Sequence, residues 1–176
     1  MNHLARQFGR RSRTRTGWLK AACAGVVGVW MIDGFTNFVW RRQRQQVIER
    51  EIEARPSGAT PAKRAAQRAN ENLRLDCSER ELRLLGHAIH YALGVVPAIL
   101  YGWARKPGFA PARGALFGLA SCVALDYVCG RLFGVCGPAD HYPWQAHFRG
   151  IGGHAAYGLA VETTLGLIER APRFTR

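Results

Sequence analysis

The sequence is poor in acidic residues and lacks the short motifs of common enzymes and zinc modules. Aspartate and glutamate number 12 against 25 lysines and arginines, so the 176-residue chain carries a net charge of +13. Five cysteines with no CxxC pair exclude a disulfide framework and a zinc knuckle. No nucleophile elbow, phosphate loop or dinucleotide fingerprint is present either. We therefore expect a single-domain protein that is not an enzyme.

Lysine is also scarce, so the positive charge is almost all arginine. Only Lys20, Lys63 and Lys106 are lysines. Arginine binds phosphate through two parallel hydrogen bonds, which suits anionic lipids and nucleic acids alike. A nucleic-acid protein would place aromatic residues among its basic ones, whereas here the aromatics lie in apolar stretches. We expect the lipid bilayer as the partner, with anionic lipids contacting the arginine-rich segments, and no nucleic acid.

What the chain does have is four apolar stretches, at about 18–40, 84–104, 114–135 and 151–168. A helix of about 20 apolar residues can cross a bilayer. The mean hydropathy is only −0.14, because basic segments separate and flank these stretches. The sequence predicts an all-α, integral-membrane four-helix bundle with a charged helical extension after the first span. A soluble, basic helical protein is the competing class.

The segments outside the spans are charged. Residues 1–16 form a basic arm, and residues 41–83 form a charged, partly helical connector that is interrupted at 56–58. The first span resembles the core of a signal peptide, but no small-residue cleavage site follows, so we expect it to be retained. Arginine and lysine in the N-terminal arm, the loop at 105–113 and the C-terminal tail predict that both termini are cytoplasmic. The long connector, with eleven such residues, argues the other way.

Each apolar stretch contains ionisable residues, which are costly in a membrane and usually face a bundle interior. The candidates for buried polar or relay positions are Asp33, His87, His90, Asp126, His154 and Glu162. Small residues at four-residue spacing allow helix backbones to approach closely. The glycines predicted to pack helices are Gly94, Gly102, Gly114, Gly118, Gly150 and Gly158.

Three interpretations of these polar residues remain open. They fix helix packing, relay protons or ions, or hold a metal ion. Metal sites usually show spacings such as HExxH, and here His87 and His90 form only HxxH. We favour the structural interpretation and expect neither a cofactor nor a metal. Cys122, Cys129 and Cys136 share a helix face at seven-residue spacing and are interpreted as small packing residues.

The loop before the last stretch is rich in aromatic residues and proline. Tyr142, Pro143 and Trp144 are predicted to anchor this loop at the membrane interface, where aromatic side chains concentrate. Proline limits the freedom of the backbone on either side. We expect the loop to pack back onto the bundle.

Several of these motifs resemble the YagU-like family of small bacterial inner-membrane proteins. The residues that carry the resemblance are Asp33, the run from Gly86 to Gly94, Asp126, Tyr142-Pro143-Trp144, Gly153-His154, Tyr157-Gly158 and Glu162. An acidic residue often follows the third-span aspartate in that family, and here Tyr127 takes its place. The resemblance implies residence in the bacterial inner membrane and a role in acid stress, with no known reaction.

Overall fold

The computed structural model describes the backbone of residues 2–171 and the side chains from residue 17 onward, and this part of the chain is helical with no strand. The side chains of the predicted basic arm (1–16) and the last five residues lie outside it. The α-helices are α1 (Asn2–Trp40), α2 (Gln45–Ala54), α3 (Pro61–Leu73), α4 (Glu79–Ala104), α5 (Pro111–Cys122), α6 (Gly130–Leu132) and α7 (Trp144–Arg170). A π-helical segment (Val123–Cys129) joins α5 to α6, and short 3-10 turns lie at Pro56–Gly58 and Ala139–His141. The predicted all-α class is confirmed.

Three helical stretches are long and apolar enough to cross a membrane. They are Gly17–Trp40, Glu79–Ala104 and Pro111–Leu132, which contain the first two predicted spans and most of the third, whose last three residues (133–135) lie beyond the helix. The fourth predicted span forms the middle of α7, which is long enough but less apolar because it contains His154 and Glu162. The chain is therefore a helical protein with at least three membrane-type helices in its described part.

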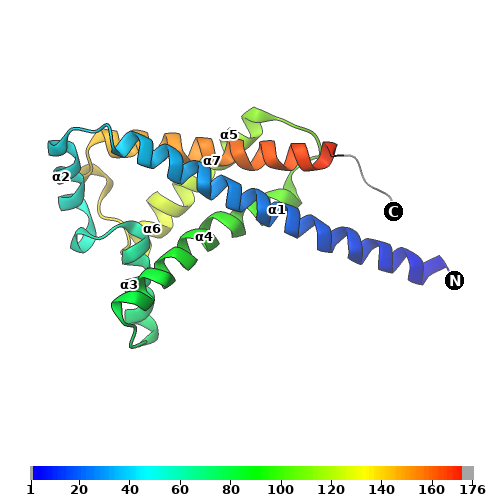
Figure 1. The fold of residues 1–176 in the computed structure, drawn as a ribbon, viewed down its shortest axis with the longest axis horizontal. Helices are drawn as coiled ribbons and strands as arrows, with labels where there is room; N and C mark the ends of the chain where they lie inside the picture. Colours follow the sequence, from blue (N-terminus) through cyan, green and yellow to red (C-terminus); the bar gives the residue numbers. More distant parts are fainter. Residues whose placement is uncertain (1, 172–176) are drawn as a thin grey trace.

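The long helices form an open row rather than a closed four-helix bundle (Figure 1). α1 packs between α4 and α7, and α7 packs between α1 and α5. Gly25 lies against Val95 of α4, whereas Gly28 lies against Tyr157 of α7. α1 thus has a small-residue contact with each neighbour. α4 and α5 meet near the loop that links them, where the rings of Tyr101 and Phe117 stack 4.2 Å apart.

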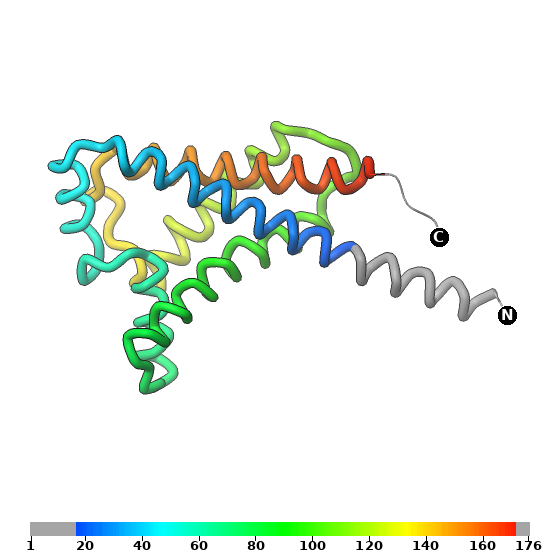
Figure 2. Tube along the Cα trace, in the orientation of Figure 1, coloured from blue at the N-terminus to red at the C-terminus, as the bar shows by residue number. Residues whose placement is uncertain are grey.

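The sequence predicted that the connector continues α1 as a charged helical extension, but the structure breaks the helix between α1 and α2. α1 ends at Trp40, and Arg44 has extended backbone angles before α2 begins, so the chain turns sharply there. Figure 2 shows α2 and α3 lying across one end of the long helices, while the first coloured turns of α1 and the end of α7 lie toward the opposite end. α4 starts at a capping box in which Ser78 and Glu81 each accept a hydrogen bond from the backbone N–H of the other.

The buried core is small, and much of the apolar surface faces outward. The buried cluster is Ala21, Ala24, Ala98, Tyr157, Val161 and Leu165. Large apolar side chains on the outside include Trp30, Trp103, Leu116 and Leu132. Soluble monomers rarely expose so much continuous apolar surface, whereas a membrane protein presents it to lipid.

Candidate metal centre

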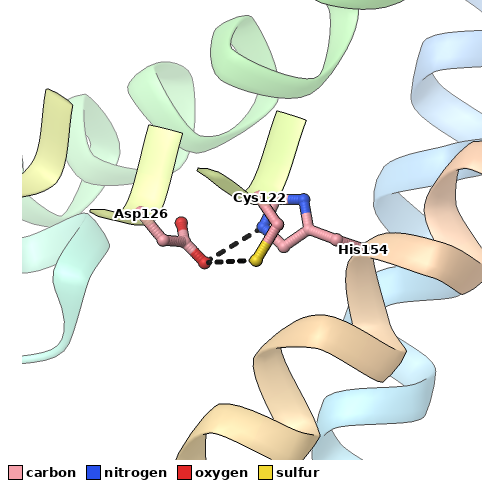
Figure 3. Close-up of side chains that lie close together, drawn as sticks. All are labelled: Cys122, Asp126 and His154. Atoms are coloured by element: carbon pink, nitrogen blue, oxygen red, sulfur yellow. Dashed lines mark hydrogen bonds and ion pairs between the residues drawn. The ribbon is translucent and has the colours of Figure 1, made fainter. Parts of the chain in front are cut away.

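Three potential ligand atoms meet where α5 passes into the π-helical segment (Figure 3). Cys122 is the last residue of α5, Asp126 lies in the π-helical segment and His154 comes from α7. His154 Nε2 is 3.1 Å from Asp126 Oδ2, and Cys122 Sγ is 3.9 Å from the same oxygen. All three ligand atoms lie within 4.8 Å of one another.

Close packing of α5 on α7 brings His154 to this position. A Cβ at Gly118 would overlap the backbone oxygen of His154, and a Cβ at Gly158 would overlap the backbone of Gly114 and Gly118. The two backbones are therefore in direct contact one helical turn before Cys122. Asp126 follows Cys122 by four residues and so lies on the same side of its helix. The cluster combines a local pair with a partner 28 or more residues away.

The site is closed on one side and open on the other. Cys122 is 2% exposed and His154 is 8% exposed, whereas the Asp126 side chain is 48% exposed. His154 Nδ1 is buried and has no hydrogen-bond partner among the described residues. The hydrogen bond to Asp126 therefore runs through Nε2, because a proton on the buried Nδ1 would have no acceptor, at a cost of about 1–3 kcal/mol.

These distances suit a small transition-metal ion. Bonds to sulfur, nitrogen and oxygen of about 2.0–2.3 Å place tetrahedral ligands about 3.3–3.7 Å apart. The observed separations of 3.1 and 3.9 Å lie within a few tenths of an ångström of that range. Shifts of that size are within the reach of side-chain torsions. The Asp126 side chain is 48% exposed, so protein does not enclose the cluster on that side.

A second histidine–carboxylate pair lies between α1 and α4. His90 Nε2 is 2.9 Å from Asp33 Oδ1, and both side chains are partly exposed. Beside them, the Trp30 indole donates to the Tyr91 hydroxyl at 3.0 Å. His87, which the sequence placed with this set, is instead exposed, because it lies one turn before His90 on the outer face of α4. The structure thus makes two separate His–Asp pairs and excludes His87 from both.

Glu162 has arginine and tyrosine partners and forms no hydrogen bond with the other five candidate polar residues in the described part of the chain. Its fully buried carboxylate accepts hydrogen bonds from Arg105 Nε at 3.0 Å and Arg113 Nη2 at 2.7 Å. The Tyr101 hydroxyl and the Ala110 backbone N–H add bonds of 2.6 and 2.9 Å. The α4–α5 loop is therefore fastened to α7 by a neutralised carboxylate.

The aromatic side chains between His154 and Glu162 do not form a continuous path for protons. Tyr157 packs edge-on against His154 at 6.4 Å, and its hydroxyl donates to the carbonyl of Gly94. Phe117 lies between Tyr157 and Tyr101, with ring centroids 5.6 and 4.2 Å away. Phenylalanine has no group that can carry a proton. The two polar centres are thus separated by an apolar ring.

Most of the predicted packing glycines lie at helix contacts. Gly94 faces Val29, Gly102 faces Ala21, and Gly114 faces Glu162. These contacts join α4 to α1 and α5 to α7, and the Gly118–Gly158 approach described above belongs to the second of them. Gly150 differs, because a Cβ there would meet only an Asp126 oxygen at 3.9 Å. It borders the metal-type cluster and does not bring two backbones together.

The loop before α7 is held by Tyr142 rather than by Trp144. The Tyr142 hydroxyl accepts a hydrogen bond from the Gly137 backbone at 3.2 Å, and burial raises the pKa of this phenol. Trp144 is 70% exposed and packs edge-on against Phe148, while Pro143 is the N-cap of α7. Trp144 is therefore free to contact lipid, and the loop itself packs near the end of α2 through Gly137 and Ala54.

No protein-family model matches the chain, and neither curated proteins nor solved structures give a match. The YagU-like resemblance therefore remains a prediction. The interpretation of the cluster as a metal centre therefore rests on its geometry alone.

Sequence reasoning missed Cys122 as a ligand and missed both arginines at Glu162. The signal for the first was the four-residue spacing of Cys122 and Asp126, which puts a thiol and a carboxylate on one helix face. In the sequence, Arg105 and Arg113 served only to predict the membrane orientation, as positive charges of a cytoplasmic loop. Nothing in their spacing points to a carboxylate 49 or more residues away.

Proposed function

We propose that this protein is a four-span membrane protein of the bacterial inner membrane that binds one transition-metal ion through Cys122, Asp126 and His154. The observation that carries the metal assignment is the convergence of three different ligand types within 4.8 Å, two of them buried. The ligands come from α5, the π-helical segment and α7. π-Helical turns are found frequently at functional sites.

The four-span topology is supported by the position of α7 in the row. α7 lies between α1 and α5, so its polar residues are covered by protein and need not face lipid. The end of the molecule where α7 finishes carries Lys20, Arg105, Lys106 and Arg113, which favours a cytoplasmic location for both termini. A reporter fused after Arg176 should therefore give a cytoplasmic signal, and a periplasmic signal would contradict this orientation.

The donor set selects the class of metal. A thiolate, an imidazole and a carboxylate suit zinc and other divalent ions of the same borderline softness, such as Fe²⁺ or Co²⁺. Magnesium and calcium prefer all-oxygen ligands. We propose zinc as the ion, with water in the fourth position on the exposed side of Asp126. Binding requires that Cys122 lose its proton, so affinity decreases as pH falls.

The magnitudes allow binding despite two unfavourable features, the required His154 tautomer and the deprotonation of the buried Cys122 thiol. With a metal on Nε2, His154 must carry its proton on Nδ1, which has no acceptor, at a cost of about 1–3 kcal/mol. Structural zinc sites bind with about 10–16 kcal/mol at neutral pH. Even a three-ligand site with much weaker binding exceeds that cost. A proton relay has less support, because Phe117 interrupts the path and a charged imidazole would bury the same unpaired N–H.

The experiment is a cobalt titration of chelator-treated protein, extracted with detergent from carbonate-washed membranes. Thiolate coordination gives Co²⁺ a charge-transfer absorption that neither histidine nor carboxylate produces. We expect one ion per chain and competition by zinc. C122S should lose the charge-transfer band, and D126N should weaken binding at least tenfold.

The matched controls are C129S and H90Q, which change the same residue types outside the cluster. Both should bind like the wild type. A third variant, H154Q, changes a buried side chain and lowers the yield of folded protein if His154 is needed for packing. D126N alters a half-exposed side chain, so it tests metal binding in either case. Equal binding by wild type and D126N, or a charge-transfer band that survives in C122S, would contradict the metal assignment. Release of the protein by carbonate would contradict the membrane assignment.

A further inference from the structure

A basic surface cavity lies at the corner between the end of α1 and the start of α2. Its volume is about 330 Å³. The residues that line it are Arg42, Gln43, Arg44, Gln46, Val47, Arg50 and Gln145. Three of them are arginines and none is acidic. On α2, Glu49 accepts a hydrogen bond from Gln45 and Glu51 pairs with Arg55 and Arg149; neither carboxylate lines the cavity.

Two helices begin at this cavity. Gln46 lies in the first turn of α2, and Gln145 lies in the first turn of α7. Neither first turn contains an acidic residue, and neither helix has a side-chain cap. The backbone N–H groups of a first helical turn have no partner within the helix and carry partial positive charge. Both helix ends therefore add to the positive field of the three arginines.

Some of the donors are fixed in place before any ligand arrives. The Arg42 guanidinium lies 3.5 Å above the Phe38 ring and donates to the Phe38 carbonyl at 3.1 Å. Arg149 donates to Gln43 Oε1 at 3.0 Å, which orients the amide of Gln43. Gln43 Nε2 is left as a buried donor without a partner among the described residues. Such preorganisation lowers the entropy lost on binding an acceptor.

With α1 spanning the bilayer, as proposed above, the cavity lies at the depth of the lipid headgroups. It follows directly on Trp40, the last residue of a membrane-type helix, and adjoins Trp144 at the start of α7. Trp144 and Phe148 are exposed beside it. Tryptophan and other aromatic residues mark the membrane–water interface in this way. A phosphate group in the adjoining leaflet is therefore within reach of the arginines.

We infer that this cavity binds the phosphate of an anionic lipid headgroup. Arginine presents paired N–H donors that match two phosphate oxygens, and the glutamine amides supply neutral donors around them. With three positive charges and no carboxylate in the lining, the cavity offers nothing to a choline cation. The inference is independent of the metal site, which lies elsewhere on α5 and α7.

The test measures lipid binding to the full-length protein in a neutral detergent by native mass spectrometry. Phosphatidylglycerol and phosphatidylcholine are added in parallel, and inorganic phosphate is added in a third arm. R42Q/R44Q/R50Q removes the three cavity arginines. The matched control, R80Q/R83Q/R131Q, removes three exposed arginines that have no ion-pair partner in the described residues. Thermal unfolding of both variants verifies that they are folded.

Wild type and the control should each bind phosphatidylglycerol at least tenfold more tightly than phosphatidylcholine. The cavity variant should bind phosphatidylglycerol at least tenfold more weakly than the control does, since each charge-assisted hydrogen bond contributes about a factor of ten. Equal weakening in the two variants would mean that only the total charge matters, and would overturn the inference. Inorganic phosphate that binds as tightly as the lipid would assign the cavity to a soluble phosphate and overturn the lipid assignment.

Discussion

Among substitutions of a described carboxylate by the amide of the same size, Glu162→Gln should destabilise the protein most. The carboxylate accepts five hydrogen bonds, three of them from the two arginines, and is fully buried. A glutamine has one oxygen, and its amide N–H₂ would point donors at donors. At least two bonds to charged or strongly polar donors are lost, each contributing about 1.5–3 kcal/mol, so we expect a loss of about 3–5 kcal/mol.

The estimate stays near the lower end because the arginines keep other partners. Arg105 retains Glu169, at 2.5 Å, and Arg113 is partly exposed and retains the carbonyl of Gly108. The assay is reversible unfolding in mixed micelles of a neutral detergent and dodecyl sulfate, followed by tyrosine and tryptophan fluorescence. At about 2–4 °C per kcal/mol for a chain of this size, thermal unfolding should shift by roughly 10 °C.

The matched control is E169Q, which makes the same change seven residues later on the same helix. The Glu169 side chain is 39% exposed, so this variant should lose less than about 1 kcal/mol. An E162Q protein as stable as the wild type would show that the buried carboxylate is not what fastens the α4–α5 loop to α7. Equal losses in E162Q and E169Q would show that burial does not set the difference.

Two further predictions concern packing and pH. G118A should lower the free energy of unfolding by about 1–3 kcal/mol, because a Cβ at this position overlaps the α7 backbone. G34A is the control: nothing lies within 4 Å of a Cβ there, so the free energy of unfolding should change by less than about 0.5 kcal/mol. Unfolding titrations that gave both variants equal stability would contradict the close α5–α7 contact. Hydrogen bonds from Arg105, against the opposing effect of burial, hold the pKa of Glu169 below its ordinary 4.5. The contribution of Glu169 to the free energy of unfolding is therefore complete above about pH 4.5 and is lost as the pH falls through the lowered pKa. The difference in stability between wild type and E169Q should shrink on acidification, and a difference that grows would refute this sign.

The helices were predictable because each depends on local signals. Apolar runs of membrane length gave the cores of α1, α4 and α5, and charged helix formers gave the connector. The break at Arg44 was missed, because the sequence from 41 to 55 favours a helix throughout, whereas the turn is accompanied by contacts of Gln43 and Glu51 with the distant Arg149. Glu51 belongs to α2 and is buried, so the chain must turn away from the axis of α1 before it reaches this residue.

The site was predictable only in part, because its partners are distant in sequence. The embedded His154 and Glu162 were identified as buried, since each lies in a glycine row on α7. Which groups they meet depends on the order of helices in the row and on the π-helical turn, and neither leaves a periodic pattern. Asp126 is more exposed than expected because α5 lies at an edge of an open row, and Asp33 of α1 is exposed because its partner His90 belongs to the helix at the other edge, α4.

The order of that row has a consequence for biosynthesis. The two inner helices, α1 and α7, are the first and the last to be made, and the outer helices α4 and α5 come between them. At about 5–20 residues per second, α7 is completed roughly 7–26 s after α1 emerges from the ribosome. Until then Gly28 of α1 has no α7 to pack against, and α5 contacts α4 through the stacked rings of Phe117 and Tyr101 but lacks its main partner. During translation, the half-made chain therefore depends on the insertion machinery or on lipid for contacts that the final helix later supplies.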